Sequence, residues 1–357
     1  MEGLILDHQF YTLDMLDAFE SFIWADRYCG YGDFEIFMPM SPSVPPSLVQ
    51  DNYLSITSSD RLMIIEQIEM ATDAETGTHL TISGRSLEAL LERRIIWGMK
   101  TLEGNLQDNI HMLLNENAIN PTDPLRKIPG LSFRPSIDPA ITSLMVNLQL
   151  ICDNLYDVIF ILCDINRIGF RILPNGPGTF VFELYKGIDR SYNQTENQYV
   201  IFSPKFENLL TSNYFETKKL VKNAALVGGE GEGDEKVLIE AVPDSGVVSG
   251  LDRREIFVSS TTRSRDEDGE DISPEEYEAL LKEDGKKAMA ETKSIVTFEG
   301  EIDAQRQFIY AQDFFIGDIV QVMNEYGMEA QSRVSELVQT HNNEGETFIP
   351  TFTTVED

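Results

Sequence analysis

The sequence predicts an α+β protein whose two ends are rich in β-strands and whose middle is partly helical. Short apolar segments alternate with turn residues up to about residue 98, helical periodicity follows, and strand patterns return from about residue 199. Within the last region, an acidic stretch at about 262–293 has the features of a helix. These changes predict three domains, at 1–98, 99–198 and 199–357, with a helical insertion in the third.

The first predicted domain consists of short strands that lie close together in the sequence. Turn residues separate its apolar segments, and a Pro-rich crossing at 39–46 divides them into two groups. Many short strands at such spacing favour a small antiparallel barrel or a sandwich. The expected strands are 3–6, 9–13, 22–26, 34–37, 53–57, 61–70 and 79–83.

The most informative stretch of the chain is a strand that runs into a helix, LTISGRSLEALLERRIIWG at residues 80–98. We expect Ser86 to cap a helix over 86–97, with Glu88 in the first turn, where the helix dipole favours an anion. Gly98 is suited to end the helix in the left-handed conformation. The buried stripe is expected to comprise Leu87, Leu90, Leu91 and Ile95. This corner is predicted to close the first domain by packing, and it carries no chemistry.

The middle domain is expected to combine helices with a hairpin. Apolar side chains at helical spacing predict helices at 105–117, 141–150 and 154–166. Two strands, at 170–173 and 179–185, are joined by a turn rich in Pro and Gly, which predicts a hairpin.

The third domain returns to short strands, interrupted by the acidic helix. That helix has a defined start, because Ser273 and Glu276 have the capping-box spacing and Pro274 suits the first turn. The expected strands are 199–202, 213–216, 221–227, 236–241, 254–259, 294–302, 318–324, 333–340 and 348–353.

The charge balance is unusual for a chain of ordinary composition. Lys plus Arg number 28 against 60 Asp plus Glu, which gives a formal net charge of −32 over 357 residues. Such a surface repels DNA and anionic lipid and argues against a protein that recognises a nucleic-acid sequence. Two interpretations stay open: a generally acidic soluble protein, or a surface past which DNA slides without binding.

The cysteines and the apolar segments bear on where the chain works. Cys29, Cys152 and Cys163 are odd in number and form no Cys-x-x-Cys pair, so neither a disulfide framework nor a structural zinc site is expected. Cys163 should be a buried small hydrophobe. The N-terminus lacks the basic region of a signal peptide, and the apolar stretch at 155–165 is too short to cross a bilayer. We therefore expect synthesis in the cytoplasm and no membrane insertion.

No pattern in the sequence predicts catalysis. His8, His79, His111 and His341 lie in unrelated elements, and no nucleophile elbow or His-Glu-x-x-His motif occurs. The Gly-rich segment at 227–234 carries three carboxylates that would repel a phosphate, so it predicts a hairpin tip. We predict no catalytic, cofactor-binding or metal-binding residue and a protein that is not an enzyme.

Five segments stand out in order along nearly the whole chain: WADRYCGYGDFEIF at 24–37, the corner at 84–98, FELYKGIDR at 182–190, a second β region spanning 202–229, and FIGDIV at 315–320. Together they resemble the tail-hub proteins of long-tailed bacteriophages of the siphophage type. The resemblance implies two tube-like β-barrel domains in each subunit, with an α/β domain between or beside them.

The resemblance also implies a function and partners. Three subunits would place six barrels around a channel and adapt a sixfold tail tube to a threefold tip. The implied partners are the distal tail protein and tail tube above, tip or fibre proteins below, and the end of the tape-measure protein in the channel. DNA would pass through without specific binding, and the protein would be part of the virion, at the tail tip or baseplate.

Two other functions stay open for such a chain. Many related tail-tip proteins continue into a cell-wall hydrolase or fibre segment, whereas this sequence stops at Asp357 soon after its last expected strand, which favours a hub alone. The alternatives are a tail-associated enzyme that cleaves peptidoglycan and the hub of a bacterial contractile injection system. A cleft with perturbed carboxylates or a metal site would favour the enzyme.

Overall fold

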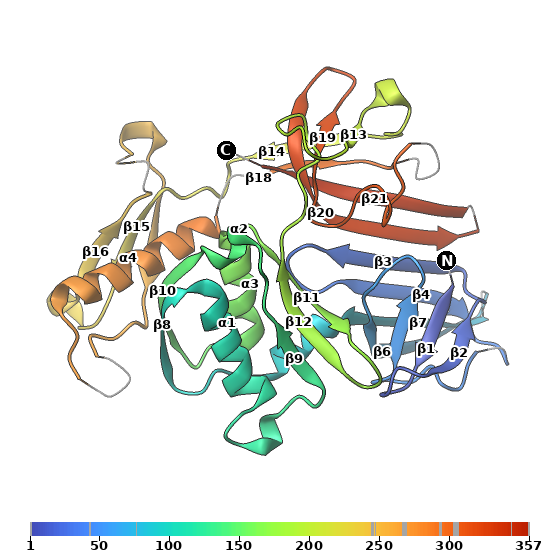
Figure 1. The fold of residues 1–357 in the computed structure, drawn as a ribbon, viewed down its shortest axis with the longest axis horizontal. Helices are drawn as coiled ribbons and strands as arrows, with labels where there is room; N and C mark the ends of the chain where they lie inside the picture. Colours follow the sequence, from blue (N-terminus) through green and yellow to red (C-terminus); the bar gives the residue numbers. More distant parts are fainter. Residues whose placement is uncertain are drawn as a thin grey trace.

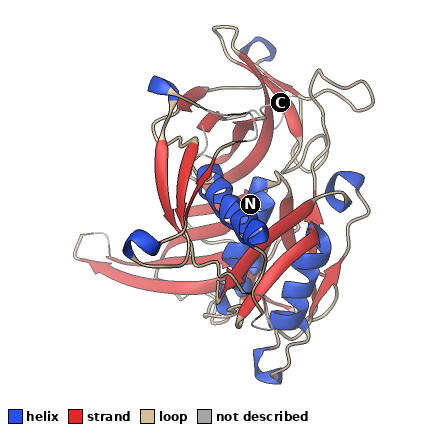
Figure 2. Ribbon diagram, turned by 90° about the vertical axis from the view of Figure 1, so that its left-hand side faces the viewer, coloured by secondary structure: helices blue, strands red, loops and turns tan. Residues whose placement is uncertain are grey.

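A computed structural model shows how these segments are arranged, and strands predominate in it (Figure 2). The described residues are 2–42, 44–75, 77–243, 246, 248–265, 270–292, 295–302, 307–343 and 345–355. Parts of the acidic stretch at 262–293 and of the strand expected at 294–302 fall outside these residues.

Most of the described strands belong to one large sheet. Its order is β14-β18-β21-β20-β3-β4-β7-β6-β5-β1-β2, with β19 paired to β20 and β13 paired to β19. The strands from the first part of the chain are β1 (Gly3–Leu6), β2 (Thr12–Leu16), β3 (Ser21–Arg27), β4 (Asp33–Pro39), β5 (Tyr53–Ile56), β6 (Met63–Asp73) and β7 (Gly77–Ser86). Those from the last part are β13 (Ile201–Phe202), β14 (Asn213–Thr217), β18 (Ile295–Glu299), β19 (Ile319–Met323), β20 (Glu329–Asn342) and β21 (Gly345–Thr354).

The two β regions are therefore not separate closed barrels. Strand β3 pairs with β4 on one side and with β20 on the other, from Glu336 opposite Arg27 to Asn342 opposite Ser21. In the part of the chain that the structure describes, the sheet does not close on itself, because β2 and β14 each have a strand partner on one side only. The backbone groups of β3 are satisfied by a strand about 300 residues away, which no local pattern reveals.

The large sheet has one covered and one uncovered face. In β4 the alternation is strict: Phe34, Ile36 and Met38 are buried, and the residues between them are exposed. The covered face of the first β region contributes an apolar core that includes Trp24 and Ile82. The covered face of the last β region packs around a second core that includes Phe298, Val334 and Phe352.

The middle of the chain forms two smaller sheets with helices packed against them. Strands β8 (Met99–Asn105) and β10 (Met145–Ile151) pair, and β9 (Leu131–Arg134), β11 (Gly169–Pro174) and β12 (Phe180–Tyr185) form a second sheet. The helices are α1 (Leu106–Leu114), continued by a π-helical turn (Asn115–Ile119), α2 (Pro139–Thr142) and α3 (Leu155–Ile165). The predicted hairpin and the first and third predicted helices are present.

The helix predicted at 141–150 is wrong. Only α2 is helical there, and residues from Met145 onward form β10, paired with β8 over its whole length. Apolar residues in this stretch fit a helical and a strand period about equally well. The partner strand β8 decides between them, because it pairs with β10 along its whole length and supplies the backbone hydrogen bonds of an antiparallel ladder.

The corner at 80–98 differs from its prediction in detail. The expected α-helix is a 3-10 helix, η1 (Leu87–Arg93), and the Ser86 side chain makes no cap hydrogen bond to it. Leu87, Leu90 and Leu91 are buried as predicted, but Ile95 is 42% exposed and Ile96 is buried in its place. The tighter turn changes which residue faces inward beyond the helix end. Gly98 has a φ of 80°, but it does not end the helix as predicted, because η1 ends at Arg93 and its C-cap Arg94 is extended.

A third unit lies at the far side of the molecule from the large sheet, with α1 and α3 between them (Figure 1). Its strands β15 (Ala224–Gly228), β16 (Leu238–Ala241) and β17 (Glu255–Ser259) form a sheet that α4 (Pro274–Ala290) covers. The predicted start of α4 is confirmed, because the Ser273 hydroxyl accepts from the Glu276 amide and Pro274 occupies the first turn. The predicted domain boundaries remain a prediction. Short 3-10 turns occur at Pro124–Arg126, Pro204–Phe206, Gly233–Glu235 and Gly250–Asp252.

Candidate assembly surface

The described residues contain no group of three or more His, Cys, Asp or Glu side chains placed to hold a metal ion. Each histidine packs separately against an aromatic ring: His8 on Tyr53, His79 on Phe37, His111 on Phe133 and His341 on Phe19. Cys163 is buried as predicted, and burial raises the pKa of its thiol well above the ordinary value. That the chain has no catalytic residue stays a prediction.

The corner contains a buried polar network that the sequence did not predict. The Ser86 hydroxyl accepts a hydrogen bond of 2.8 Å from the Gly32 amide and donates to the Glu88 carboxylate. Glu88 is fully buried and also accepts from Arg61 at 2.8 Å and from the Ile172 amide at 2.9 Å. These bonds connect the first β region to the middle of the chain.

Arg61 is the cation at the centre of this network. Burial opposes its charge, but Glu88, Tyr185 and Asp26 act together so that the net pKa of the guanidinium is raised. Arg61 lies 4.0 Å from Asp26 and donates to the backbone oxygen of Arg27 at 2.7 Å. Burial raises the pKa of the Asp26 carboxyl above its ordinary value, and the charge of Arg61 opposes this rise.

Two segments that carried the family resemblance meet in space. Asp318 accepts hydrogen bonds of 2.7 Å from the Ile188 amide and from the Arg190 side chain. A Cβ atom added to Gly187 would lie 2.0 Å from the backbone carbonyl of Gly317, so both backbones approach as closely as glycine allows. The Gly-x-Asp-Arg and Gly-Asp segments, about 130 residues apart, are thus two halves of one contact.

The uncovered face of the large sheet extends over both β regions. One row of directly opposed residues crosses six strands on this face: Gln67, Ser83, Glu35, Ile23, Thr340 and Thr347. We call the side of the sheet that bears this row the exposed sheet face. It is continuous across the β20–β3 junction, so both β regions contribute to it.

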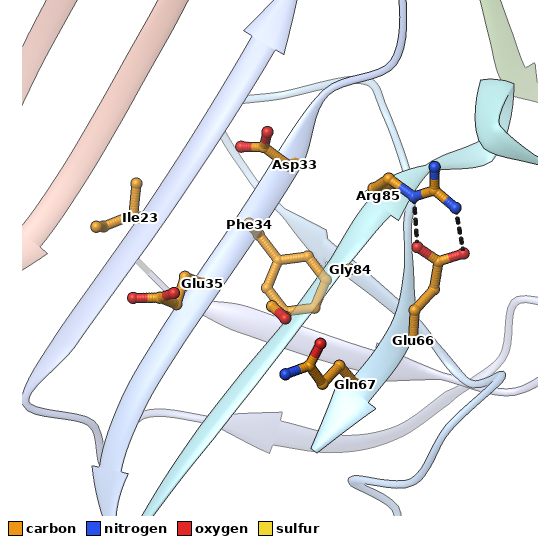
Figure 3. A pocket seen from close by; sticks show the side chains of 9 residues that line it. Ile23, Asp33, Phe34, Glu35, Glu66, Gln67, Gly84 and Arg85 are labelled. Atoms are coloured by element: carbon orange, nitrogen blue, oxygen red, sulfur yellow. Dashed lines mark hydrogen bonds and ion pairs between the residues drawn. The ribbon is translucent and has the colours of Figure 1, made fainter. Parts of the chain in front are cut away.

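A hollow of about 460 Å³ lies in this face over β3, β4, β6 and β7. Figure 3 shows Asp33, Glu35 and Glu66 around it, with Arg85 paired to Glu66. The Arg85 side chain donates to Glu66 at 2.7 Å and to Glu92 at 2.6 Å, so its charge is already neutralised within the chain. The lining is therefore acidic, and it offers no cation for binding an anion.

Beside the hollow, the junction between the two β regions carries an ion-pair cluster. Arg27 donates to Asp33 at 2.8 Å and to Glu336 at 2.6 Å. Asp33 and Arg27 come from the first β region and Glu336 comes from β20. This cluster holds the two regions in one register, while the net charge of the face stays negative.

The fold is that of phage tail proteins. The structure is similar to a tail protein from Neisseria meningitidis, with a TM-score of 0.58 at 12% identity, covering 99% of this chain and 96% of that one. It is also similar to a 43 kDa tail protein of prophage MuSo2 from Shewanella oneidensis, with a TM-score of 0.59 at 11% identity, covering 99% and 98%. The prophage tail protein gp18 from Listeria monocytogenes gives a TM-score of 0.54 at 13% identity, covering 100% and 95%.

The sequence itself identifies the family. Residues 3–352 match the family described as Siphovirus ReqiPepy6 Gp37-like protein, so the chain belongs to this family of siphovirus tail proteins. The resemblance predicted from the sequence is thereby confirmed. No curated protein matches the chain. Among the described residues, no helix is long and apolar enough to cross a membrane.

Proposed function

We propose that this chain is the hub at the end of a siphovirus tail tube, where three copies surround a channel. The observation that carries the proposal is the exposed sheet face. It extends without interruption over both β regions, while the opposite face of the same strands packs on two apolar cores. Three copies would bring six β regions together, which matches the sixfold symmetry implied for the tube above.

The exposed sheet face is the surface that we assign to the channel. Its hollow is lined by Asp33, Glu35 and Glu66, with Arg85 the only cation among the residues that line it. DNA carries one negative charge per about 1.7 Å of its axis, so a basic lining would retain it, whereas an acidic lining lets it slide. The formal net charge of the whole chain, −32, is negative like this lining.

The role that we propose is structural and not enzymatic. The chain would sit in the virion between the distal tail protein and tube on one side and tip or fibre proteins on the other. The end of the tape-measure protein would occupy the channel until DNA is released. The buried polar groups described above support packing of the chain, because each is engaged by another group of the chain itself.

Cryo-electron microscopy of the intact particle tests this proposal. We expect three copies at the end of the tube, with Glu35 and Gln67 facing the channel. A different copy number at the tube end, or a channel lined by basic residues, would overturn it. Clearing of isolated cell walls by the purified protein would overturn the non-enzymatic role.

A further inference from the structure

Besides the edge at β2, the large sheet has two exposed edges that lie at the two ends of one path of described strands. Strand β5 pairs with β6 only at Met63 and Ile64, so from Gln67 onward β6 has a described strand partner on one side, β7. All residues of β6 from 67 to 73 are exposed. At the other end, β14 pairs with β18 alone among the described strands. Exposed edges of this kind are templates for pairing with another chain.

We infer that neighbouring copies join through these edges, with residues 68–70 of β6 in one copy pairing antiparallel with residues 214–216 of β14 in the next. The inference rests on the proposed ring and adds the contact that would close it. The partner is a second copy of this chain, and the contact is head-to-tail, because two different edges meet. Repeated around an axis, such a contact generates a closed ring.

The number of strands in the path fixes the direction of this pairing. Eight of the described strands lie on it, β14-β18-β21-β20-β3-β4-β7-β6, and each neighbouring pair is antiparallel. With an even number of alternating strands, β6 and β14 run in opposite directions. For strands that run along the ring axis, rotation about that axis preserves their direction, so β6 meets the next copy's β14 antiparallel. The junction would then have the same hydrogen-bond pattern as the rest of the sheet.

The side chains at both edges suit burial against each other. Ile68 and Met70 stand opposite Ile82 and Leu80, on the covered face of the sheet, yet they are 37% and 59% exposed. On the same face of the opposite edge, Tyr214 packs edge-on against Phe298. Pairing of the two edges would continue the apolar core of one copy into that of the next.

The charges at the two edges are complementary. No Lys or Arg occurs between Arg61 and Arg85, and the β6 edge carries the exposed Glu69. Directly after β14 the chain presents two exposed cations, Lys218 and Lys219, in a sequence with about twice as many acidic as basic residues. Antiparallel pairing brings the end of β14 that precedes Lys218 towards the start of the exposed part of β6. Opposite charges then meet at the junction.

Cysteine cross-linking in assembled particles tests the inference. Glu69→Cys and Phe215→Cys introduce thiols on the exposed sheet face at the two edges, because Glu69 lies opposite Thr81 and Phe215 opposite Thr297. The background carries Cys152→Ser to remove the exposed native thiol. With a short bis-maleimide, the double variant should give covalent species of two and three copies, each copy being 40.4 kDa, and no species of four.

The controls separate this inference from the proposed function. No ladder, meaning no cross-linked species of two and three copies, should form with either single-cysteine variant or with Glu69→Cys combined with Phe257→Cys. Phe257 suits this control because it is exposed much like Phe215 but lies on the small sheet. A ladder that stops at two copies, or a cross-link to another protein, overturns the edge pairing. If microscopy shows three copies at the tube end and no ladder forms, the edge pairing fails and the hub survives. If the chain lies elsewhere in the particle, the hub proposal fails as well.

Discussion

Glu88 is the residue on which the polar contacts of the corner converge. Its placement in the sequence indicated an anion in the first turn of a helix, and the structure buries it against Arg61, Ser86 and the Ile172 amide. Spacing along the chain locates Glu88 correctly in the first turn. Spacing alone cannot identify Arg61 as the ion-pair partner of Glu88, because Arg61 lies in a connection between strands 27 residues earlier in the chain.

Glu88→Gln should lower the free energy of unfolding by about 3–5 kcal/mol, because it leaves Arg61 buried without its closest counter-ion. Urea unfolding measures the change. The matched control is Glu92→Gln, which removes the half-exposed partner of Arg85 and should cost less than about 1 kcal/mol. Equal effects of the two substitutions would show that the buried pair does not stabilise the corner.

Asp26 makes the stability of the protein depend on pH. Burial raises the pKa of the Asp26 carboxyl in the folded state, so protonation of this group stabilises the fold. This stabilisation is complete when the pH is below the unfolded-state pKa of about 3.8, and it is lost as the pH rises through the folded-state pKa. Asp26→Asn should therefore gain stability relative to the wild type as the pH rises above about 4, measured by thermal unfolding. A difference that stays constant with pH would contradict the raised pKa.

At the scale of elements, the strands and helices with a defined local signal were predictable, and those decided by distant partners were not. The α4 helix followed from its capping box, and β4 followed from its alternation. Strand β10 was missed, because β8 decides its conformation. The 3-10 form of η1 was missed because the same apolar residues fit both kinds of helix.

Leu91→Asp should prevent incorporation of the protein into particles, because Leu91 in η1 is fully buried and burying an ionised carboxylate there is costly. Particle-associated protein, measured by quantitative mass spectrometry, should fall to background. Ile95→Asp, at a position 42% exposed in the same corner, should assemble normally. Normal assembly of Leu91→Asp would show that the corner does not support the first β region.

Gly285→Ala tests how closely α4 packs on its sheet. In an exposed helix this change stabilises by about 1 kcal/mol. Here the added Cβ would lie 2.5 Å from the Ala241 Cβ and 2.8 Å from a Val227 methyl group, so we expect a loss of about 1–3 kcal/mol. Thermal unfolding measures whether Gly285→Ala lowers or raises stability. A gain in stability would indicate that α4 packs more loosely on its sheet.

At the scale of the whole molecule, the family and the β-rich ends were predictable from the sequence, but their union was not. The resemblance to tail-hub proteins implied two separate barrels, one from each region. The β20–β3 pair joins them through backbone hydrogen bonds, which carry no sequence signature. The exposed sheet face, which depends on that junction, could not be assigned for the same reason.

If copies join as proposed, reversing the charge of Lys218 and Lys219 to Glu should reduce incorporation into particles at least tenfold, because two exposed cations at the β14 edge would become anions facing Glu69 of the next copy. Adding Glu69→Lys should restore part of the loss. Lys127→Glu combined with Lys205→Glu makes the same change of net charge at exposed positions away from the edge and should have little effect. A loss equal to that of this control pair would count against the junction.

The β20–β3 pair also sets an order in time. Arg27 and Glu336, which are bonded in the finished sheet, are separated by 309 positions along the chain. During synthesis, β3 therefore has one bare edge until β20 has left the ribosome, and contacts of such high sequence separation form late. A prematurely terminated chain would lack the strand that joins its two β regions. The capacity to build a tail would thus be acquired only when translation is nearly complete.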